Sequence, residues 1–471
     1  MGNVRSPVFF LIAAAVGAAL FLVTRAIDND YLFFAGYTVL QFIVLATAWN
    51  ILGGYCGYVN FGSAAFFAVG AYSTVTLHKL GANPGRYFPD ALVDVAQTVL
   101  PLNIPVLIVV AGIVAGLIGL GTGYLTLRLR GAFFAIATLA LAVVLQTLII
   151  NWDFVGGSRG AYIIRPQDAN LGFVNLPYIQ WLFLLMILLS VIAVTVARMI
   201  ERSRLGYGFA TIRDDELAAE ACGVPTLRLK LIATTISGAL MGMAGAPFPY
   251  YIGYLEPSSA FGLAYAVNSI AMPMIGGTTL WVGPLIGALL LGIIQQIATV
   301  TISSAVNLLI VGFLLIGFVI MAPAGIVGLV REFLRATAPS RLNARAVTLL
   351  AIASYCFLIG LGGVVFGLAA AMSAGNAALA GLGIFALVLS LVYLACAYGL
   401  TKLEVWSTLL TTIALGVSIP LSFVFIWLDP RSPNVTVQVF CLVVDIATVW
   451  YLQRDDVKRL YRPLAERRVM S

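Results

Sequence analysis

Uninterrupted runs of about 20 apolar residues recur along the whole chain, and short segments rich in Gly, Pro, Asn and charged residues separate them. One such run, WLFLLMILLSVIAVTVARMI, occupies residues 181–200. A helix of about 20 residues crosses the hydrocarbon core of a bilayer, whereas a barrel strand needs about 10 residues that alternate between apolar and polar. Because these runs do not alternate, the pattern predicts transmembrane helices.

The apolar runs predict fourteen membrane segments, of which the eighth is short enough to be a broken or tilted helix. Their approximate spans are 8–24, 32–52, 64–80, 103–127, 132–152, 178–198, 229–250, 262–275, 282–301, 305–322, 346–371, 377–400, 405–428 and 434–452. We therefore expect an all-α, polytopic membrane protein.

Composition agrees with a lipid environment. Hydrophobic residues make up 61% of the 471 positions and charged residues 10%, against about 25% in a typical soluble domain. The 46 glycines suit close helix packing in lipid. The five cysteines have no C-x-x-C spacing and there is one histidine, His78, so we expect neither a disulfide framework nor a metal site. We also expect no cofactor and no nucleic-acid partner.

The distribution of Lys and Arg predicts the orientation, because these residues accumulate on the cytoplasmic side. With both termini in the cytoplasm, most of the 26 Lys and Arg residues lie inside. Six fall outside: Arg25, Lys79, Arg86, Arg159, Arg165 and Arg431. We expect a multi-pass protein of the bacterial inner membrane.

A basic segment divides the predicted helices into two groups. Residues 331–345, REFLRATAPSRLNAR, contain a proline and read as a cytoplasmic linker. Before it lies a core of about ten helices, residues 1–330. After it, residues 346–471 form a unit of about four helices with a basic cytoplasmic tail.

The cytoplasmic loop 199–228 is the most informative polar segment. Its middle part, 209–221, predicts a short helix with Asp214, Asp215 and Glu216 in the first turns, where the helix dipole favours carboxylates, and Gly223 after its end. Two interpretations are open: a peg that docks on a soluble ATPase, and an ordinary loop helix lying at the lipid headgroups.

No catalytic motif is present in the sequence. G-x-S-x-G, H-E-x-x-H and the phosphate-binding G-x-x-x-x-G-K-[ST] loop are all missing. We therefore expect no enzyme activity, and ATP-driven transport would require hydrolysis on a separate polypeptide.

Four stretches together resemble the LivM/LivH-type permeases of branched-chain amino acid ABC importers. In the 199–228 loop the family pattern is met at Arg204, Gly206, Ile212, Arg213, Asp214, Ala218, Ala219, Gly223 and Val224. GGYCGYVNFGSAAFFAVGAY (53–72), RLRGAFFAIATLALA (128–142) and GGTTLWVGPLIGA (276–288) are similar to further family elements, and the LRG element is of the LivM type. The resemblance covers roughly residues 30–330.

Two positions depart from the family pattern and weaken the inference of a branched-chain substrate. Ser63 stands where family members commonly have histidine, and Gly156-Gly157-Ser158-Arg159-Gly160 replaces a Thr-Gly-Gly sequence. Related permeases also serve urea, short amides, other amino acids and sugars.

The resemblance implies a translocation subunit that imports branched-chain or related amino acids, with amides or urea as further candidates. Its implied partners are cytoplasmic ATP-binding subunits, a second LivH-like permease, a periplasmic substrate-binding protein and the lipid bilayer. The helix that contacts the ATPase would carry Arg213, Asp214, Asp215, Glu216, Ala219 and Gly223. The rival hypotheses are an ion-coupled secondary transporter, which usually needs intramembrane carboxylates, and an accessory membrane scaffold.

A weak internal sequence similarity suggests where the transport path would run. Residues 53–70 and 276–292 both open with Gly-Gly at a predicted cytoplasmic helix end, and transporters commonly place the path between related halves. The polar residues that would line it are Asn50, Asn60, Ser63, Thr138, Gln146, Asn268 and Gln295. For each of them a helix–helix hydrogen bond is the alternative to substrate contact.

Asp445 lies near the middle of the last predicted span. A carboxylate at that depth costs about 2.5–3.5 kcal/mol on insertion scales, so it should face protein or be protonated. A structural hydrogen bond and a functional relay are both open, and we expect residues 346–452 to be an accessory module.

Overall fold

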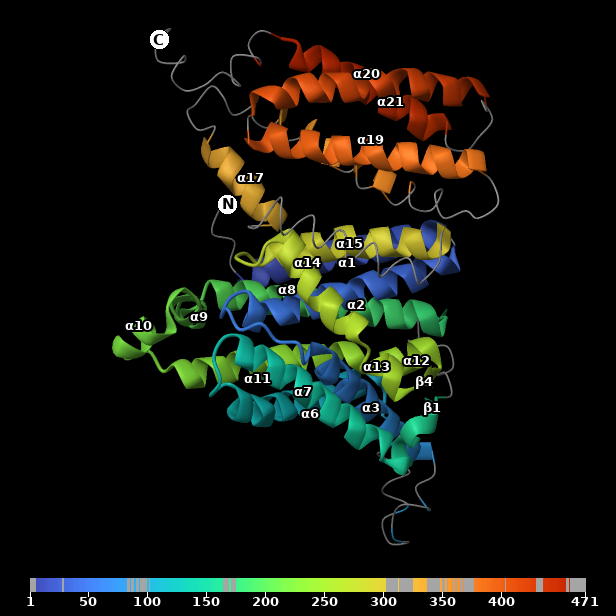
Figure 1. Cartoon of the computed structure of the whole chain (residues 1–471). Helices are drawn as coiled ribbons and strands as arrows, with labels where there is room; N and C mark the ends of the chain where they lie inside the picture. Colours follow the sequence, from blue (N-terminus) through green and yellow to red (C-terminus); the bar gives the residue numbers. More distant parts are fainter. Residues whose placement is uncertain are drawn as a thin grey trace. The chain divides into compact units, whose positions relative to one another are not determined.

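A computed structural model describes most of the chain as helix (Figure 1). The described residues are 6–27, 29–82, 100, 102–163, 169–170, 175–301, 325–336, 377–402, 404–428 and 435–454, with scattered positions at 85, 89, 93, 312, 348–367 and 457. Contacts divide the chain into unit 1, residues 1–296 and 311–327, and unit 2, residues 297–310 and 328–471.

Unit 1 consists of long helices joined by short turns. Its long helices are α1 (Ser6–Ile27), α2 (Asp30–Gly53), α3 (Ser63–Ala82), α6 (Ile104–Thr126), α7 (Ala132–Ile150), α8 (Tyr178–Glu201), α11 (Thr226–Gly245), α14 (Leu263–Gly276) and α15 (Val282–Thr301), of which residues 297–301 fall in unit 2. Its shorter helices are η1 (Asp153–Val155), η2 (Gly157–Arg159), α9 (Arg204–Asp214), α10 (Glu216–Ala221), α12 (Phe248–Ile252) and α13 (Pro257–Ala260).

Strands in the described residues are only two residues long. β1 (Ala161–Tyr162) pairs antiparallel with β4 (Tyr254–Leu255), and β2 (Ala169–Asn170) pairs with β3 (Asn175–Leu176). These hairpin-like pairs belong to the connections, so the predicted all-α class is confirmed.

Helix α11 is the centre of unit 1. It packs most extensively against α6, and also against α3 and α2, while α2 packs against α8 and α14. Glycines bring α3 and α11 together: a Cβ at Gly245 would lie 2.0 Å from the Phe67 carbonyl oxygen, and one at Gly70 would lie 2.0 Å from that of Gly242. Such contacts between backbones are how helices associate in lipid.

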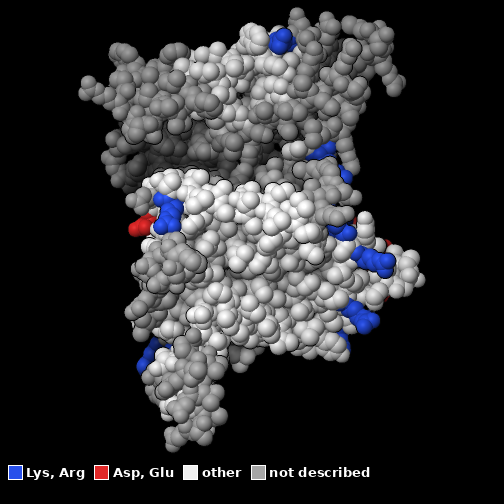
Figure 2. Space-filling model, turned by 180° about the vertical axis from the view of Figure 1, so that it is seen from behind, with Lys and Arg blue, Asp and Glu red and all other residues white. Residues whose placement is uncertain are grey.

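Charge is arranged at the helix ends of unit 1. Figure 2 shows an uncharged surface between its ends, with most of the visible basic side chains at the edge where α9 and α10 lie. Arg128, Arg130, Arg202, Arg204, Arg213 and Arg228 are exposed there. The sequence-based assignment of these residues to one face agrees with this arrangement.

Unit 2 contains α19 (Ala377–Lys402), α20 (Val405–Leu428) and α21 (Val435–Leu452), with α20 packed between the other two. Its buried apolar cluster includes Tyr393, Cys396, Leu415 and Leu452, with Cys356 from the preceding helical segment. Helix α17 (Gly325–Ala336) begins in unit 1 and ends in unit 2. The start of the predicted 331–345 linker is therefore helical.

Eight helices among the described residues are long and apolar enough to cross a membrane, and further shorter apolar helices include Val282–Gln296 and Cys441–Leu452. Most of the fourteen predicted segments correspond to a helix of unit 1 or unit 2. The exceptions are 346–371, which is described only at scattered positions, and 305–322, which lies almost wholly outside the described residues. The protein is thus a polytopic membrane protein.

Candidate functional site: the α9–α10 segment and the glycine-rich turns

The predicted helix 209–221 is two helices with a break at Asp215. Ser203 begins α9, its Oγ accepting hydrogen bonds from the backbone nitrogens of Leu205 and Gly206 at 3.2 and 3.4 Å. Asp215 has an extended backbone, and its Oδ1 accepts a 3.0 Å bond from the backbone nitrogen of Ala218. An aspartate at this position satisfies a free N–H of the second helix, which favours ending one helix and starting another.

The residues predicted to contact an ATPase separate into exposed and anchored groups. Arg213, Asp214 and Asp215 are exposed, whereas Ala219 is buried and Gly223 ends the segment with a φ of 80°. Glu216 does not belong to the exposed tip, because its side chain is only 13% exposed. Its place at the surface is taken by Leu217, which is 63% exposed.

Glu216 is held by a buried lysine that the sequence analysis missed. Lys230, near the start of α11, is 3% exposed, and its Nζ lies 2.7 Å from Glu216 Oε1. Nζ also donates to the Tyr58 hydroxyl at 3.2 Å and to the Leu127 carbonyl at 3.1 Å. The Tyr58 hydroxyl in turn donates to Glu216 Oε2. The three groups form a closed triangle between α10, α11 and the turn that follows α2.

A second, exposed layer of charge surrounds this triangle. Arg130 Nε lies 3.5 Å from Glu216 Oε1, and Arg130 Nη2 lies 3.1 Å from Glu220 Oε2. Glu220 Oε1 accepts a 2.8 Å bond from the Thr226 hydroxyl. Because both side chains of the Arg130–Glu220 pair are more than 40% exposed, solvent screens their attraction.

The network shifts the pKa values of Glu216 and Tyr58, which lie outside the membrane-spanning helices. Burial alone would raise the pKa of Glu216, but hydrogen bonds from Lys230 and Tyr58 and the charges of Lys230 and Arg130 hold that pKa below its ordinary value. Burial, followed by the hydrogen bond to Glu216, raises the pKa of Tyr58 well above its ordinary value. Glu216 is therefore a carboxylate and Tyr58 a neutral donor at physiological pH.

The two Gly-Gly turns contact the end of α8 and the α9–α10 segment that follows it. Gly57 has a φ of 80°, and a Cβ there would lie 3.0 Å from Cγ of Arg213. In the other turn, the backbone nitrogen of Trp281 donates a 2.6 Å bond to Glu201 at the end of α8. The two turns also approach each other, because a Cβ at Gly54 would lie 2.8 Å from the Thr278 carbonyl oxygen.

Five of the seven predicted path residues form two separate sets. In the first, the hydroxyls of Ser63 on α3 and Ser269 on α14 are 2.8 Å apart, and Gln295 Nε2 on α15 donates to Asn268 Oδ1 at 2.8 Å. Ser269 was not predicted, although it directly follows Asn268 in the sequence. All of these bonds join different helices, so the helix–helix alternative describes them in this conformation.

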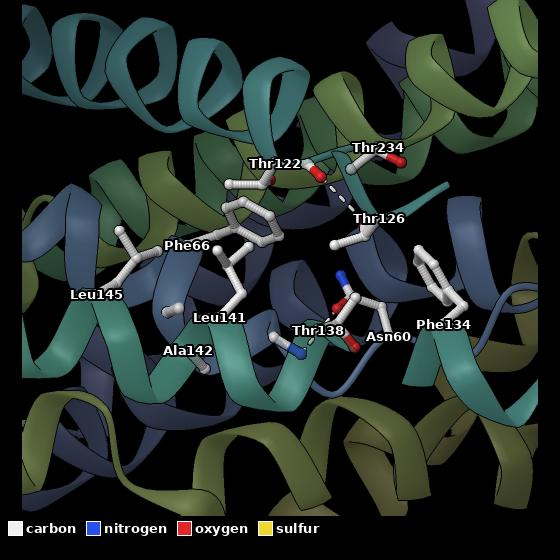
Figure 3. Close-up of a pocket in the computed structure, with 12 residues that line it drawn as sticks. Asn60, Phe66, Thr122, Thr126, Phe134, Thr138, Leu141, Ala142, Leu145 and Thr234 are labelled. Atoms are coloured by element: carbon white, nitrogen blue, oxygen red, sulfur yellow. Dashed lines mark hydrogen bonds between the residues drawn. The ribbon is translucent and has the colours of Figure 1, made fainter. Parts of the chain in front are cut away.

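The second set lies in a narrow cleft between α3, α6, α7 and α11, shown in Figure 3. Asn60 Oδ1 accepts a 2.7 Å bond from the backbone nitrogen of Gly62, and Thr138 Oγ1 accepts one of 3.2 Å from that of Phe61. The cleft also has apolar lining, such as Phe66 and Leu141, and room for about one water molecule.

Two predicted path residues belong to neither set. Asn50 is buried near the end of α2, and Gln146 is partly buried on α7. The structure places neither in the cleft, and it brings neither to the Ser63–Ser269 contact. Across the described residues, no group of His, Cys, Asp and Glu side chains could hold a metal ion.

Comparison with known proteins identifies the family of unit 1. The model of the branched-chain amino acid transport system / permease component family matches residues 31–319. The high-affinity branched-chain amino acid transport system permease protein LivM of Escherichia coli strain K12 is 27% identical over 358 residues, covering 71% of this chain and 78% of that protein.

Two further relatives are named for branched-chain amino acid transport and for ribose import. The probable branched-chain amino acid transport permease protein LivH of Methanocaldococcus jannaschii is 26% identical and covers 57% of this chain and 82% of its own length. The ribose import permease protein RbsC of Escherichia coli strain K12 is 24% identical, covering 43% of this chain and 64% of that protein. No solved structure matches the chain. The family match spans more than half of the sequence, and the chain belongs to the branched-chain amino acid transport permease family, with LivM-type proteins among its relatives.

Proposed function

We propose that the chain is the membrane-spanning subunit of an ABC importer that moves branched-chain or related amino acids from the periplasm to the cytoplasm. The observation that carries this proposal is the α9–α10 segment. It presents Arg213, Asp214, Asp215 and the exposed Leu217 on its outer side, while Glu216 anchors it from within. An exposed apolar side chain among charges suits docking in a cleft of a soluble protein. ATP hydrolysis would take place on that partner.

The arrangement of basic residues supports a cytoplasmic position for α9 and α10, with both termini on the same side. Arg25, Lys79 and Arg159 are the only basic residues at the opposite helix ends among the described positions of unit 1. Cys222, at the end of α10, is exposed and provides a natural probe. An impermeant thiol reagent added outside intact spheroplasts should leave Cys222 unmodified. Rapid modification of Cys222 would show that α9 and α10 lie on the periplasmic side.

The importer would contain further subunits. A LivH-like second permease, two ATP-binding subunits and a periplasmic substrate-binding protein are the partners implied by relatives that are named as components of such systems. The amide and hydroxyl groups of Asn60, Ser63, Thr138, Asn268 and Gln295 are candidates for the path, because all five are buried polar side chains that hydrogen-bond to neutral groups. Urea and short amides are further candidate substrates, because these amide and hydroxyl side chains could hydrogen-bond to them.

Charge reversal at the exposed carboxylates tests the energy coupling. Replacing Asp214 and Asp215 by lysine in the full complex should reduce ATP-dependent uptake by about tenfold or more, since like charges would face the docking surface. The matched control is Asp153→Lys, an exposed aspartate in the connection after α7. Uptake of branched-chain amino acids into proteoliposomes at the wild-type rate by the double variant would remove the docking assignment.

For unit 2 we propose an accessory role in assembly or regulation, with residues 1–330 as the transport core and 331–345 as the connection. The family match ends at residue 319, before unit 2's long helices begin. A chain ending near Ser340 should still insert and bind the ATP-binding subunits. Loss of that binding would show that unit 2 belongs to the core.

A further inference from the structure

Lys230 differs from most basic residues at its end of unit 1 by its burial. It is 3% exposed, whereas Arg128, Arg130, Arg202, Arg204, Arg213 and Arg228 are exposed. An ammonium group is costly to bury unless its donors are all paired. The position of Lys230 therefore requires a set of partners that stays in place.

The three donors of the ammonium group have three partners, and these come from three different segments. Glu216 belongs to α10, Tyr58 to the turn 54–62 and Leu127 to the end of α6. Lysine presents three donors on a compact tetrahedral centre, which fits three partners in different directions better than the planar fork of arginine does. The Nζ atom also lies 4.7 Å from the centre of the Tyr58 ring, so the cation attracts the ring face as well.

The turn held by Lys230 leads directly to both sets of polar residues. Asn60 lies two positions after Tyr58, and its side chain caps the turn at Gly62. Phe61 bonds through its backbone to Thr138, and Ser63 begins α3 and contacts Ser269. A displacement of Tyr58 would therefore reach the groups that line the cleft and the α3–α14 contact within a few residues.

We propose that Lys230 is a positioning residue that joins the α10 helix to the 54–62 turn, so that movement of α10 is transmitted to the polar residues between the helices. The proposal rests on the proposed function, because α10 moves only if an ATPase binds it. Glu216 and Tyr58 act with Lys230 as one unit, and Arg130 contacts this unit from its exposed side, with its Nε 3.5 Å from Glu216 Oε1.

The test compares buried members of the network with exposed charged residues in the complete transporter. Lys230→Met removes the ammonium group and keeps the chain length, and Glu216→Gln removes the carboxylate charge at constant shape. The matched controls are Arg128→Met and Glu220→Gln, which remove equivalent charges from exposed side chains that bond to Tyr124 and to Arg130 and Thr226, respectively. Each variant is assembled with its partner subunits in proteoliposomes, and both uptake and ATP hydrolysis are measured.

We expect Lys230→Met and Glu216→Gln to raise the ATP hydrolysed per molecule transported by about fivefold or more, because hydrolysis continues while transport falls. The double variant should resemble the single variants, since either change breaks the same unit. Arg128→Met and Glu220→Gln should leave the ratio within about twofold of the wild type.

A merely structural role would give a different result. If uptake and hydrolysis fall together, or if the ratio stays at the wild-type value, Lys230 only stabilises the fold and the proposal is wrong. Failure of both buried variants to assemble would lead to the same conclusion. The proposed function has its own test: it is refuted if the wild-type complex shows no uptake that depends on the binding protein. Failure of the proposed function and failure of the Lys230 proposal are therefore distinguishable.

Discussion

Asp445 provides a quantitative prediction for unit 2. The residue is 2% exposed on α21, and both of its carboxylate oxygens accept hydrogen bonds. Oδ1 accepts from the Tyr355 hydroxyl at 2.7 Å, and Oδ2 accepts from the Ser418 hydroxyl on α20 at 2.8 Å. Asp445 on α21 therefore connects to α20 and to the helical segment that carries Tyr355. These bonds correspond to the structural hydrogen bond that was one of the two roles considered for Asp445, the other being a functional relay.

The substitution Asp445→Asn should destabilise unit 2 by a measurable amount. The amide oxygen can accept from one hydroxyl, while the NH₂ group faces the other. Hydrogen bonds between membrane helices are worth about 0.6 kcal/mol on average and about 1.7 kcal/mol at most, and Asp445 accepts two of them. A loss of about 1–2 kcal/mol corresponds to a fall in Tm of about 2–8 °C.

Thiol reactivity can report the unfolding of unit 2 directly. Cys356 and Cys396 are fully buried there, so a dye that fluoresces on reaction with thiols reports their exposure on heating. The Cys56 and Cys222 thiols of unit 1 are first replaced by serine, which leaves the signal to unit 2.

Thr412→Val is the control, because its hydroxyl donates to the Thr408 carbonyl of the same helix, α20. It should shift the midpoint by less than about 2 °C. Equal midpoints for wild type and Asp445→Asn, or an equal fall for Thr412→Val, would show that Asp445 does not hold the helices together.

Two further predictions concern unit 1. Gly245→Ala should lower the yield of folded, monodisperse protein in size-exclusion chromatography, because its Cβ would lie 2.0 Å from the Phe67 carbonyl oxygen. Gly121→Ala, which has open space around it, should not lower the yield. Equal yields for the two variants would contradict the close contact between α3 and α11. The lowered pKa of Glu216 means that its ion pairs stabilise the fold above the ordinary pKa of 4.5 and are lost as the pH falls below it. A fluorophore on Cys222 should thus keep a constant anisotropy from pH 8 to about pH 5 and become more mobile below about pH 4.5, and mobility that rises already near pH 6 would refute this assignment.

The apolar runs were sufficient to predict most of the helices and the class of fold. Length and hydropathy determine where a helix crosses lipid, so α2, α8 and α11 could be placed from sequence alone. The break at Asp215 was missed because Asp214, Asp215 and Glu216 were assigned together to the first turns of one helix, although aspartate is also a favoured N-cap residue. Only the capping bond to Ala218 shows that the aspartate begins a new helix.

The partners of polar residues were much harder to predict than their positions. Glu216 was grouped with Asp214 and Asp215 because the three are consecutive, yet Lys230 lies fourteen positions later and Tyr58 more than a hundred positions earlier. A pairwise contact of this kind depends on how α2, α10 and α11 pack. The available signal was the lysine itself, a lone cation at the start of a long apolar run, and its meaning depended on the fold.

The close packing of α3 on α11 gives the Lys230 network a mechanical consequence. Gly70 and Gly245 allow these two backbones to touch, so α3 and α11 move together more readily than they move apart. The 54–62 turn enters α3 directly, and Lys230 binds the same turn from α11. The turn is consequently fixed at both sides to one rigid pair of helices. A displacement of α10 therefore cannot be absorbed by the turn alone, and it is passed to α3 and to the contact between Ser63 and Ser269.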